Sequence, residues 1–495
     1  MSSEYTSGQR QVESIGNYRL DIQSIIFRKI NGESIDVTNM LAGFSIYQSI
    51  FQPFMKANLM LYDAVSLHTN FPLVGEETIE ISWSPTIQGS TGVVNEIDRD
   101  EDDTYRLIFC VDKVEKQVVS SKGSESIYIL NLYSVEMLDN VKKRIQAAYN
   151  TTYTNAIGIL LENELNMTAN GKKLKGMTDL DQPEASKGAF KFIVPNMKPL
   201  DTLLWMTKRA VATEYGNGSY FVFFERFDGF YFNTVGQMIK YQFEQSMNHG
   251  YPGNTDENYP RVIKTYYYIP NYNAQAMSSF NLPVNAQQRV LTSLTVNKRY
   301  STFQKILGGY FENELYQIDV YNKEIISTPS TVLTSEIYGN SPNNFNSKEF
   351  QNLSLTKDNG KGTKTKIKYA IVQDQGDYPN APHYFSEKYN EALRMQSAMA
   401  QINITVSAIG DTRVQAGDVI AIKIPAAQGF TTPNDEDQYL TGEYLVTDIK
   451  HAISLGGEYT MVMNLSRDTY SSSIETKQTY TPGTSAAVTN PAREN

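Results

Sequence analysis

Four histidines and one cysteine are the side chains of this sequence best suited to metal binding or nucleophilic chemistry. His68, His249, His383 and His451 are far apart, and none lies within metal-ligand spacing of another histidine or of Cys110. We therefore expect no zinc site. Cys110 falls within a predicted strand, where an inert buried thiol is expected, because a reactive thiolate needs an accessible, electropositive setting. A single cysteine also excludes an intramolecular disulfide framework.

Three aspartates in an acidic run have the spacing of the first ligands of a calcium-binding loop. Asp98, Asp100 and Asp102 match positions one, three and five of an EF-hand. That loop also requires glycine at its sixth position and glutamate at its twelfth, and this chain has Asp103 and Phe109 there. The run therefore predicts a solvated acidic loop rather than a metal site.

Other catalytic and phosphate-binding motifs are incomplete or missing. Gly360-Lys361-Gly362-Thr363 lacks the glycine that a P-loop needs five residues earlier, where the chain has Leu355. There is no Gly-x-Ser-x-Gly nucleophile motif. Pairs of Asp and Glu are numerous, so two-carboxylate glycoside hydrolysis stays an open alternative, although no particular pair stands out. We predict a protein that is not an enzyme and has no catalytic, cofactor-binding or metal residues.

Composition places the chain among globular proteins of more than one domain. Its 495 residues are 40% hydrophobic and 12% aromatic, and its formal charge is -10. An acidic balance argues against a dedicated nucleic-acid-binding protein, because that affinity rests on clustered Lys and Arg. The beginning of the chain has no signal-peptide pattern, and no apolar run approaches the roughly 20 residues of a membrane helix. We expect a protein without a membrane segment that folds in a cytoplasm.

Alternating apolar residues predict strands over the first part of the chain. After a polar, flexible segment at 1–16, they indicate a β domain over 17–133. The strands are expected at 18–26, 46–53, 57–62, 78–83, 105–114 and 126–133.

Helical periodicity follows and predicts an α+β insert domain over 134–250. The first helix is expected from Val135 to Ile145, with an apolar face at positions 138, 141, 145 and 149, and the second at 156–165. Pro199 begins a third, since its fixed dihedral suits a first helical turn. An aromatic hairpin is expected at 220–232, turning near Asp228-Gly229.

A second β region is predicted in two parts. Its first part covers 251–325, and its main part covers 384–470 and begins with a helix at 385–400. The Ser-, Asn-, Gly- and Lys-rich segment 326–383 between them is expected to be an insertion or mobile loop. The Ser-, Thr-, Pro- and Gly-rich segment 471–495 is expected to be a disordered tail.

The stretch 402–465 repeats the order of strands, turns and loops of 57–133. In both, a strand is followed by a Gly-acid turn, a strand, an acidic loop, a strand, a Gly turn and a final strand. Gly75-Glu76 and Gly417-Asp418 are the proposed equivalent turns. Two unrelated antiparallel meanders could look alike, but the matching order favours an internal duplication.

Several stretches at both ends of the body resemble the baseplate hub proteins of T-even-type contractile-tailed phages, and more loosely the hub-like part of type VI secretion spikes. The resemblance covers about 17 to 470, is weak in the middle, and departs from the family at 326–383. It is carried by LYDAVSLHT at 61–69, GEETIEI at 75–81, NEALRMQ at 390–396, IGD at 409–411, QAGDVI at 415–420 and YLVTDIKH at 444–451.

The resemblance implies an α+β, mainly β fold with two tube-like antiparallel β-barrel domains per chain. It implies a homotrimeric ring in the virion tail baseplate, assembled in the host bacterial cytoplasm. Its expected partners are a trimeric tail spike, a hexameric tail tube or tube-initiator protein, other baseplate proteins and the tape measure. DNA would pass through without specific binding, and no cofactor is implied.

Two alternatives remain open from the sequence. The motif Ala416-Gly417-Asp418-Val419-Ile420 also occurs in wall-binding modules resembling LysM, which suggests a glycan-binding or lytic tail protein. Such modules are βααβ, whereas 414–465 is predicted to be β throughout. A tail-tube initiator of the same superfamily is the second alternative, and two tube-like units per chain favour the hub.

Overall fold

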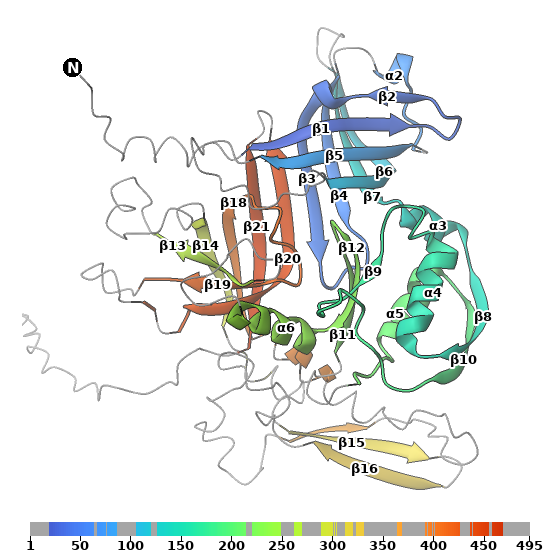
Figure 1. Ribbon diagram of the computed structural model, residues 1–495, viewed down its shortest axis with the longest axis vertical. Coiled ribbons are helices and arrows are strands. Elements are labelled where there is room, and N and C mark those ends of the chain that lie inside the picture. The colour runs from blue at the N-terminus through green and yellow to red at the C-terminus, as the bar shows by residue number, and fades with distance from the viewer. Residues whose placement is uncertain are drawn as a thin grey trace, which may run out of the picture.

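The protein has an α+β, mainly β architecture (Figure 1). In the described part of the chain, no helix is long and apolar enough to cross a membrane. The computed structural model describes residues 19–63, 67–75, 77–86, 105–119, 126–213, 220–248, 262–269, 289–299, 312–319, 323–330, 364–368, 401–425, 436–437, 439–454 and 458–468, with isolated positions at 301, 303, 392–393, 395–397 and 399.

The first barrel domain is built from an antiparallel run of strands in the order β3-β4-β7-β6-β5-β1-β2. Its inner face holds a continuous apolar core in which Phe27, Trp83 and Phe109 are buried. Burial alternates strictly along the seventh strand, as expected when one face of a strand meets the core. The strands are β1 (Arg19–Arg28), β2 (Ser34–Asp36), β3 (Leu41–Ser49), β4 (Lys56–Asp63), β5 (Thr78–Thr86), β6 (Tyr105–Val119) and β7 (Ser126–Ser134), with the short helices η1 (Thr38–Met40) and α2 (Leu67–Asn70) beside them.

The second barrel domain is closed. Its strands follow the order β19-β13-β14-β18-β21-β20, and β20 pairs again with β19 to complete the circle. All neighbouring strands are antiparallel except β13, which runs parallel to both β14 and β19. The strands are β13 (Lys264–Tyr268), β14 (Val290–Arg299), β18 (Ile402–Ile409), β19 (Val419–Lys423), β20 (Gly442–Ser454) and β21 (Tyr459–Arg467).

The two barrel domains share one strand order, which confirms the predicted internal duplication. Reading across the sheet, β3-β4-β7-β6-β5-β1 in the first domain corresponds to β14-β18-β21-β20-β19-β13 in the second. The difference lies in the last strand, because β1 is antiparallel to β5 whereas β13 is parallel to β19. The second barrel is also closed by pairing of β13 with β14, and no such pairing joins β1 to β3 among the described residues.

Two β-bulges lie at equivalent positions in the two domains. Against β7, the register of β6 shifts between Val111 and Lys113, and against β21 that of β20 shifts between Val446 and Asp448. A bulge adds an unpaired residue at one particular point of a ladder, so two unrelated meanders would not share its position. The second shared bulge lies between Leu41 and Gly43 in β3 and between Leu291 and Ser293 in β14.

Helices and two small sheets lie between the barrels in sequence, and most of them share a separate aromatic core. Thr152 caps the second helix by accepting a hydrogen bond from the backbone N–H of Asn155, and Pro199 stands at the start of the next helix as predicted. The elements are α3 (Glu136–Lys142), β8 (Ile145–Thr151), α4 (Tyr153–Leu165), β9 (Leu174–Lys175), β10 (Phe190–Met197), α5 (Pro199–Thr207), β11 (Phe221–Arg226), β12 (Gly229–Thr234) and α6 (Val235–Asn248).

The helix predicted from Val135 to Ile145 was wrong in its last three residues. It ends at Lys142, and Ile145 begins the strand β8, which pairs with β10. Val141, one of the supposed inward-facing residues, is 60% exposed. Residues 145–151 alternate in burial because one face covers the core, and this pairing outweighs the helical spacing.

The segment between β14 and β18 contains strands both in the stretch to residue 325, predicted as part of the second β region, and in the predicted insertion or mobile loop at 326–383. Its three strands form a separate sheet in the order β16-β15-β17, drawn at the bottom of Figure 1. The strands are β15 (Glu312–Asp319), β16 (Glu324–Ser330) and β17 (Lys364–Lys368). The rest of 331–383, the termini at 1–16 and 471–495, and the acidic run that begins at Asp98 lie outside the described residues.

Candidate functional site

The two barrel domains are joined edge to edge into one sheet, and this junction is the candidate functional site. Strand β20 pairs with β19 through Gly442 to Leu445 and then, on the same edge, with β3. The second ladder runs from Asp448 opposite Ser49 to Ser454 opposite Gly43. Figure 1 shows β3 and β20 side by side at the centre of the sheet. Backbone hydrogen bonds therefore connect the two copies of the duplicated unit directly.

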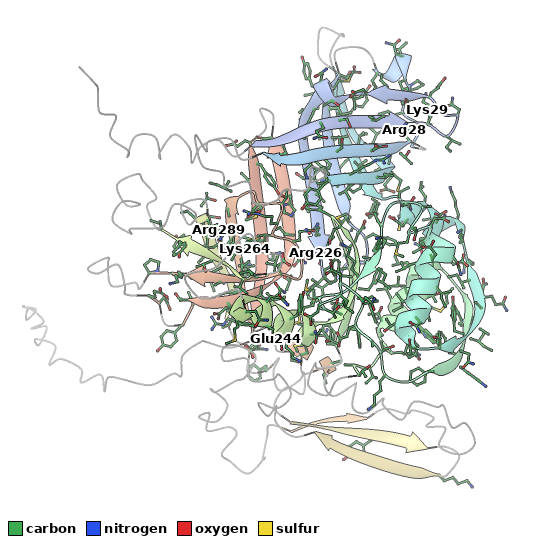
Figure 2. All side chains as sticks on the ribbon, in the orientation of Figure 1. Arg28, Lys29, Arg226, Glu244, Lys264 and Arg289 are labelled. Atoms are coloured by element: carbon green, nitrogen blue, oxygen red, sulfur yellow. The ribbon has the colours of Figure 1, made fainter. Side chains whose placement is uncertain are left out.

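The turn before β19 is locked into this junction by a buried ion pair. Arg226, at the end of β11, donates from Nη1 to Asp418 Oδ1 at 2.7 Å and from Nη2 to Asp418 Oδ2 at 3.3 Å. The same Nη1 reaches the carbonyl oxygen of Ala416 at 3.1 Å. Two parallel bonds from a guanidinium to a carboxylate fix orientation as well as distance. Figure 2 labels Arg226 near the centre of the molecule.

Two glutamine side chains extend the junction to the first barrel. Gln48, on β3, donates from Nε2 to Gln415 Oε1 at 3.2 Å and accepts from the backbone N–H of Ala416 at 3.2 Å. Gln415 Oε1 also accepts from the backbone N–H of Phe227 at 2.9 Å. All of these groups are buried, so each bond replaces one that water would otherwise make. One amide oxygen thus links the first barrel, the second barrel and the β11–β12 hairpin.

A third glutamine holds the same turn from the helix α6. Gln242 donates from Nε2 to the carbonyl oxygen of Gly417 at 3.0 Å and accepts from the backbone N–H of Val419 at 2.7 Å. Gly417 has a φ of 86°, a conformation that a residue with a side chain rarely adopts. The turn is therefore bonded from three directions: from β3, from the hairpin and from α6.

Phe227, at the tip of the β11–β12 hairpin, is wedged between the two barrels. Its ring centroid lies 5.4 Å from that of Trp83 and 5.6 Å from that of Tyr105 in the first barrel. It lies 5.0 Å from the ring of His451 in the second barrel. Contacts of this kind contribute beyond the area that they bury. The hairpin therefore sets how the two barrels meet.

His451 is a structural residue of the junction. Its Nδ1 lies 2.7 Å from the hydroxyl oxygen of Tyr459. Burial lowers the pKa of His451 to about 3, against the opposing influence of Asp411 and Asp418. The imidazole is therefore neutral at neutral pH, where it packs against Phe227.

A second buried ionic cluster attaches the hairpin to the first barrel. Lys172 Nζ lies 2.7 Å from Glu136 Oε2 and 2.5 Å from Glu225 Oε1. The other oxygen of Glu225 accepts from Ser134 Oγ at 2.5 Å and from the backbone N–H of Met55 at 2.8 Å. Burial raises the pKa of Glu136, although Lys172 acts in the opposite direction. Burial also disfavours the charge of Lys172, but the two carboxylates outweigh it and raise its pKa.

The structure describes only some of the residues considered for chemistry from the sequence. Cys110 is buried as predicted, and burial raises the pKa of its thiol to about 11. Among the described residues, no group of His, Cys, Asp and Glu could hold a metal ion. His68 belongs to α2, whereas His249 and His383 lie outside the described residues, as do Asp98 and the Gly360–Thr363 motif.

The turn equivalence predicted from the sequence was displaced by one residue. The backbone N–H of Val111 bonds to the carbonyl of Glu77, as that of Val446 bonds to the carbonyl of Asp418. Glu77, and not Glu76, is therefore the counterpart of Asp418; Glu76 itself lies outside the described residues. The junction residues Arg226, Gln415, Gln48, Phe227 and Lys172 were not predicted, because their partners are distant in sequence and no local pattern marks them.

The comparisons with known proteins concern the fold. No family model matches the sequence, and no curated protein matches it. Among solved structures, the chain is similar to a tail protein from Neisseria meningitidis, with 10% identity, a TM-score of 0.47, and coverage of 91% of this chain and 97% of that one. It is similar to the 43 kDa tail protein of a Shewanella oneidensis prophage, with 11% identity, a TM-score of 0.46, and coverage of 90% and 98%. An E. coli protein described as a type VI secretion component with structural similarity to phage tail proteins has 8% identity, a TM-score of 0.41, and coverage of 91% and 77%.

Proposed function

We propose that this protein is the structural baseplate hub of a contractile phage tail. In this role, three copies form a ring that adapts a hexameric tail tube to a trimeric central spike and leaves a channel for DNA. The observation that carries the proposal is the pair of equivalent barrel domains fused into one sheet. A three-fold ring can match a six-fold tube only if each subunit presents two similar surfaces.

The buried junction supports this role because an adaptor must hold its two surfaces in a constant relation. The β3–β20 ladder, the Arg226–Asp418 pair and the Phe227 wedge all connect the two barrels or the hairpin between them. Such contacts favour one arrangement of the barrels over alternatives. A flexible pair of domains could not present six regularly spaced surfaces.

Charge and chemistry are consistent with a channel-forming structural protein. The formal charge of -10 would let DNA slide through without adhering, since phosphate binding needs clustered cations. We propose no catalytic role. The partners would be the spike, the tube or its initiator, other baseplate proteins and the tape measure, within a virion tail assembled in the host cytoplasm.

Imaging by electron microscopy together with light scattering tests the proposal. The full-length protein is expected to have three times the mass of one chain and to give three-fold projections containing a six-lobed ring. A monomer or dimer at micromolar concentration would contradict the hub. Binding to purified peptidoglycan by such a monomer would instead favour the wall-binding alternative, and six-fold rings of six chains would favour the tube initiator.

A further inference from the structure

Three charged side chains lie buried together beside the β11–β12 hairpin. Lys172 Nζ lies 2.7 Å from Glu136 Oε2 and 2.5 Å from Glu225 Oε1. We call these three residues the Lys172 cluster. In the described part of the chain, neither glutamate forms an ion pair with any other cation. If every group is ionised, two carboxylates and one ammonium leave an excess negative charge in the interior, which is unfavourable.

The Lys172 cluster attaches the hairpin to the first barrel. Glu225 lies in β11, and its Oε2 accepts hydrogen bonds from Ser134 Oγ at 2.5 Å and from the backbone N–H of Met55 at 2.8 Å. Ser134 ends β7 and Met55 directly precedes β4, so both belong to the first barrel. Glu136 begins α3, and Lys172, between α4 and β9, joins the two carboxylates.

The two carboxylates differ in the donors that surround them. Glu225 accepts from Lys172 and from both donors of the first barrel. Glu136 accepts from Lys172 and, at 3.2 Å, from Asn170 Nδ2. Each donor favours the ionised form, so Glu225 keeps its charge and a proton on Glu136 removes the excess. Rotation of the Asn170 carboxamide by a half-turn presents its oxygen, which accepts a hydrogen bond from the protonated acid.

The electrostatic surroundings of Glu136 act in the same sense. Burial raises the pKa of Glu136; Lys172 opposes this, and Glu225 adds to it. Lys172 stays charged, because the two carboxylates outweigh its burial and raise its pKa. Near Glu136 on β6 lies Cys110, which is neutral because burial raises the pKa of its thiol to about 11. Asp112, on the same strand, is exposed.

We propose that the Lys172 cluster is a proton-controlled contact that holds the β11–β12 hairpin against the first barrel. With a proton on Glu136 the cluster is neutral and the contact is closed. Loss of that proton leaves two carboxylates competing for Lys172 and weakens the contact. The same hairpin carries Phe227 between the barrels, so its release also loosens their junction. This inference concerns a single chain and does not rest on the proposed hub.

The direction of the pH response follows from the raised pKa of Glu136. Because the folded-state pKa lies above the ordinary value of 4.5, the stabilisation is complete below pH 4.5 and is lost as pH rises through the folded pKa. Above that pKa, the equilibrium constant for opening increases by about tenfold per pH unit. The contact therefore favours acidic and neutral conditions over alkaline ones.

Cys110 reports opening of this contact in the full-length protein. It is the only cysteine of the chain and is 4% exposed. Its Sγ lies 3.8 Å from the carbonyl oxygen of Ser134, whose hydroxyl bonds to Glu225. Separation of the hairpin from the barrel exposes the thiol to an uncharged thiol reagent. The thiolate fraction itself rises with pH, so variants are compared with the unmodified protein at the same pH.

The variant Glu136→Gln tests the proposal, because glutamine has the size of the protonated acid and cannot ionise. At pH 6 we expect it to be labelled at the same rate as the unmodified protein, within about twofold. At pH 8.5 the unmodified protein should be labelled at least about tenfold faster than the variant, since only its cluster has lost a proton. Urea unfolding over the same range should show a steeper loss of stability in the unmodified protein.

The matched control neutralises a different buried carboxylate between the two barrels. Glu184 accepts from the backbone N–H of Thr234 at 2.6 Å, and Glu184→Gln should keep the pH response of the unmodified protein. Equal labelling of Glu136→Gln and the unmodified protein at pH 8.5 would overturn the proposal. Faster labelling of Glu136→Gln at pH 6, or its failure to fold, would also overturn it, because either result means that the ionised carboxylate is needed.

Discussion

The turns before β5 and β19 have the same local construction but different surroundings. In each, an acidic side chain accepts a hydrogen bond from the backbone N–H three residues earlier. Glu77 Oε1 accepts from Val74 at 2.8 Å, and Asp418 Oδ2 accepts from Gln415 at 2.8 Å. Both acids are buried, Glu77 at 1% exposure and Asp418 at 7%, so this local bond comes with the duplicated unit and does not distinguish the two copies.

The surroundings of the two turns have diverged. Val74 is 69% exposed, whereas the second turn is covered by the β11–β12 hairpin, β3 and α6. Asp418 bonds to Arg226 in addition to its own turn, while Glu77 bonds within its turn to Val74 and Gly75. The second copy of the turn thus bonds to three other elements, whereas the first leaves Val74 exposed and its buried Glu77 bonds within the turn.

The largest difference between the copies is expected on neutralising the two acids. Asp418→Asn removes the bidentate carboxylate partner of buried Arg226 and leaves only Asp228, whose Oδ1 lies 4.0 Å from Arg226 Nε, so it should lower the free energy of unfolding by about 3–5 kcal/mol. Glu77→Gln loses only charge-assisted hydrogen bonds to backbone N–H groups, which should lower the free energy of unfolding by about 1–3 kcal/mol. Urea unfolding measures both. Equal losses would show that the ion pair adds nothing to the local turn.

Removal of the hairpin wedge tests whether the junction holds the two barrels together. Phe227→Ala should lower the free energy of unfolding by about 3 kcal/mol. This is the lower end of the range for a buried aromatic side chain, because the surrounding rings can partly close the cavity. Phe51→Ala is the control, since that ring is 52% exposed, and it should change stability by less than about 0.5 kcal/mol. We also expect faster hydrogen exchange along β3 and β20 in the first variant. Unchanged exchange there would contradict the wedge role.

Alanine substitutions at the two turn glycines distinguish the cost of backbone strain from the cost of crowding by neighbouring side chains. Gly75 and Gly417 have φ values of 89° and 86°, so alanine should cost about 1–2 kcal/mol at either position. A Cβ at Gly417 would also lie 2.9 Å from Phe224 Cζ, whereas at Gly75 no atom of the described residues would lie within 4 Å of it. Gly417→Ala should therefore lose about 1–3 kcal/mol more than Gly75→Ala in thermal or urea unfolding. Equal losses of stability in the two variants would show that backbone strain alone accounts for the effect at Gly417.

The smallest expected difference is in pH dependence. By register, Gln117 in β6 is the counterpart of His451 in β20, so His451→Gln makes the two barrels alike. The folded pKa of His451, about 3, lies below the ordinary value of 6.5, so its contribution to stability is complete above pH 6.5 and is lost as pH falls toward 3.

The slope of unfolding free energy against pH measures this effect. Between pH 6 and pH 4.5 the variant should lose less stability than the unmodified protein, by about 1.4 kcal/mol per pH unit. Gln117→His is the reciprocal control. Parallel slopes for the unmodified protein and His451→Gln would show that His451 is not buried as a neutral ring in solution.

Much of the barrel architecture could be predicted from local pattern. Alternation located the strands of both copies, and the glycine-acid steps located the turns, although the first was placed one residue early because Gly75 is followed by two glutamates. The helix expected to reach Ile145 was misjudged because residues four apart, such as 145 and 149, lie on one face of an alternating strand as well as of a helix. Helix α6 was not anticipated at all.

The sequence by itself determined that the chain holds two similar β units, because periodicity and turn chemistry are local properties. It also indicated an inert Cys110, since a reactive thiolate needs an accessible, electropositive setting that a strand interior does not offer. Only the tertiary structure decided that β3 meets β20, that Arg226 reaches Asp418, and that Phe227 enters between the barrels. These contacts join residues far apart in the chain. They depend on packing of whole elements, and no single-segment propensity encodes which of two equivalent turns will be covered.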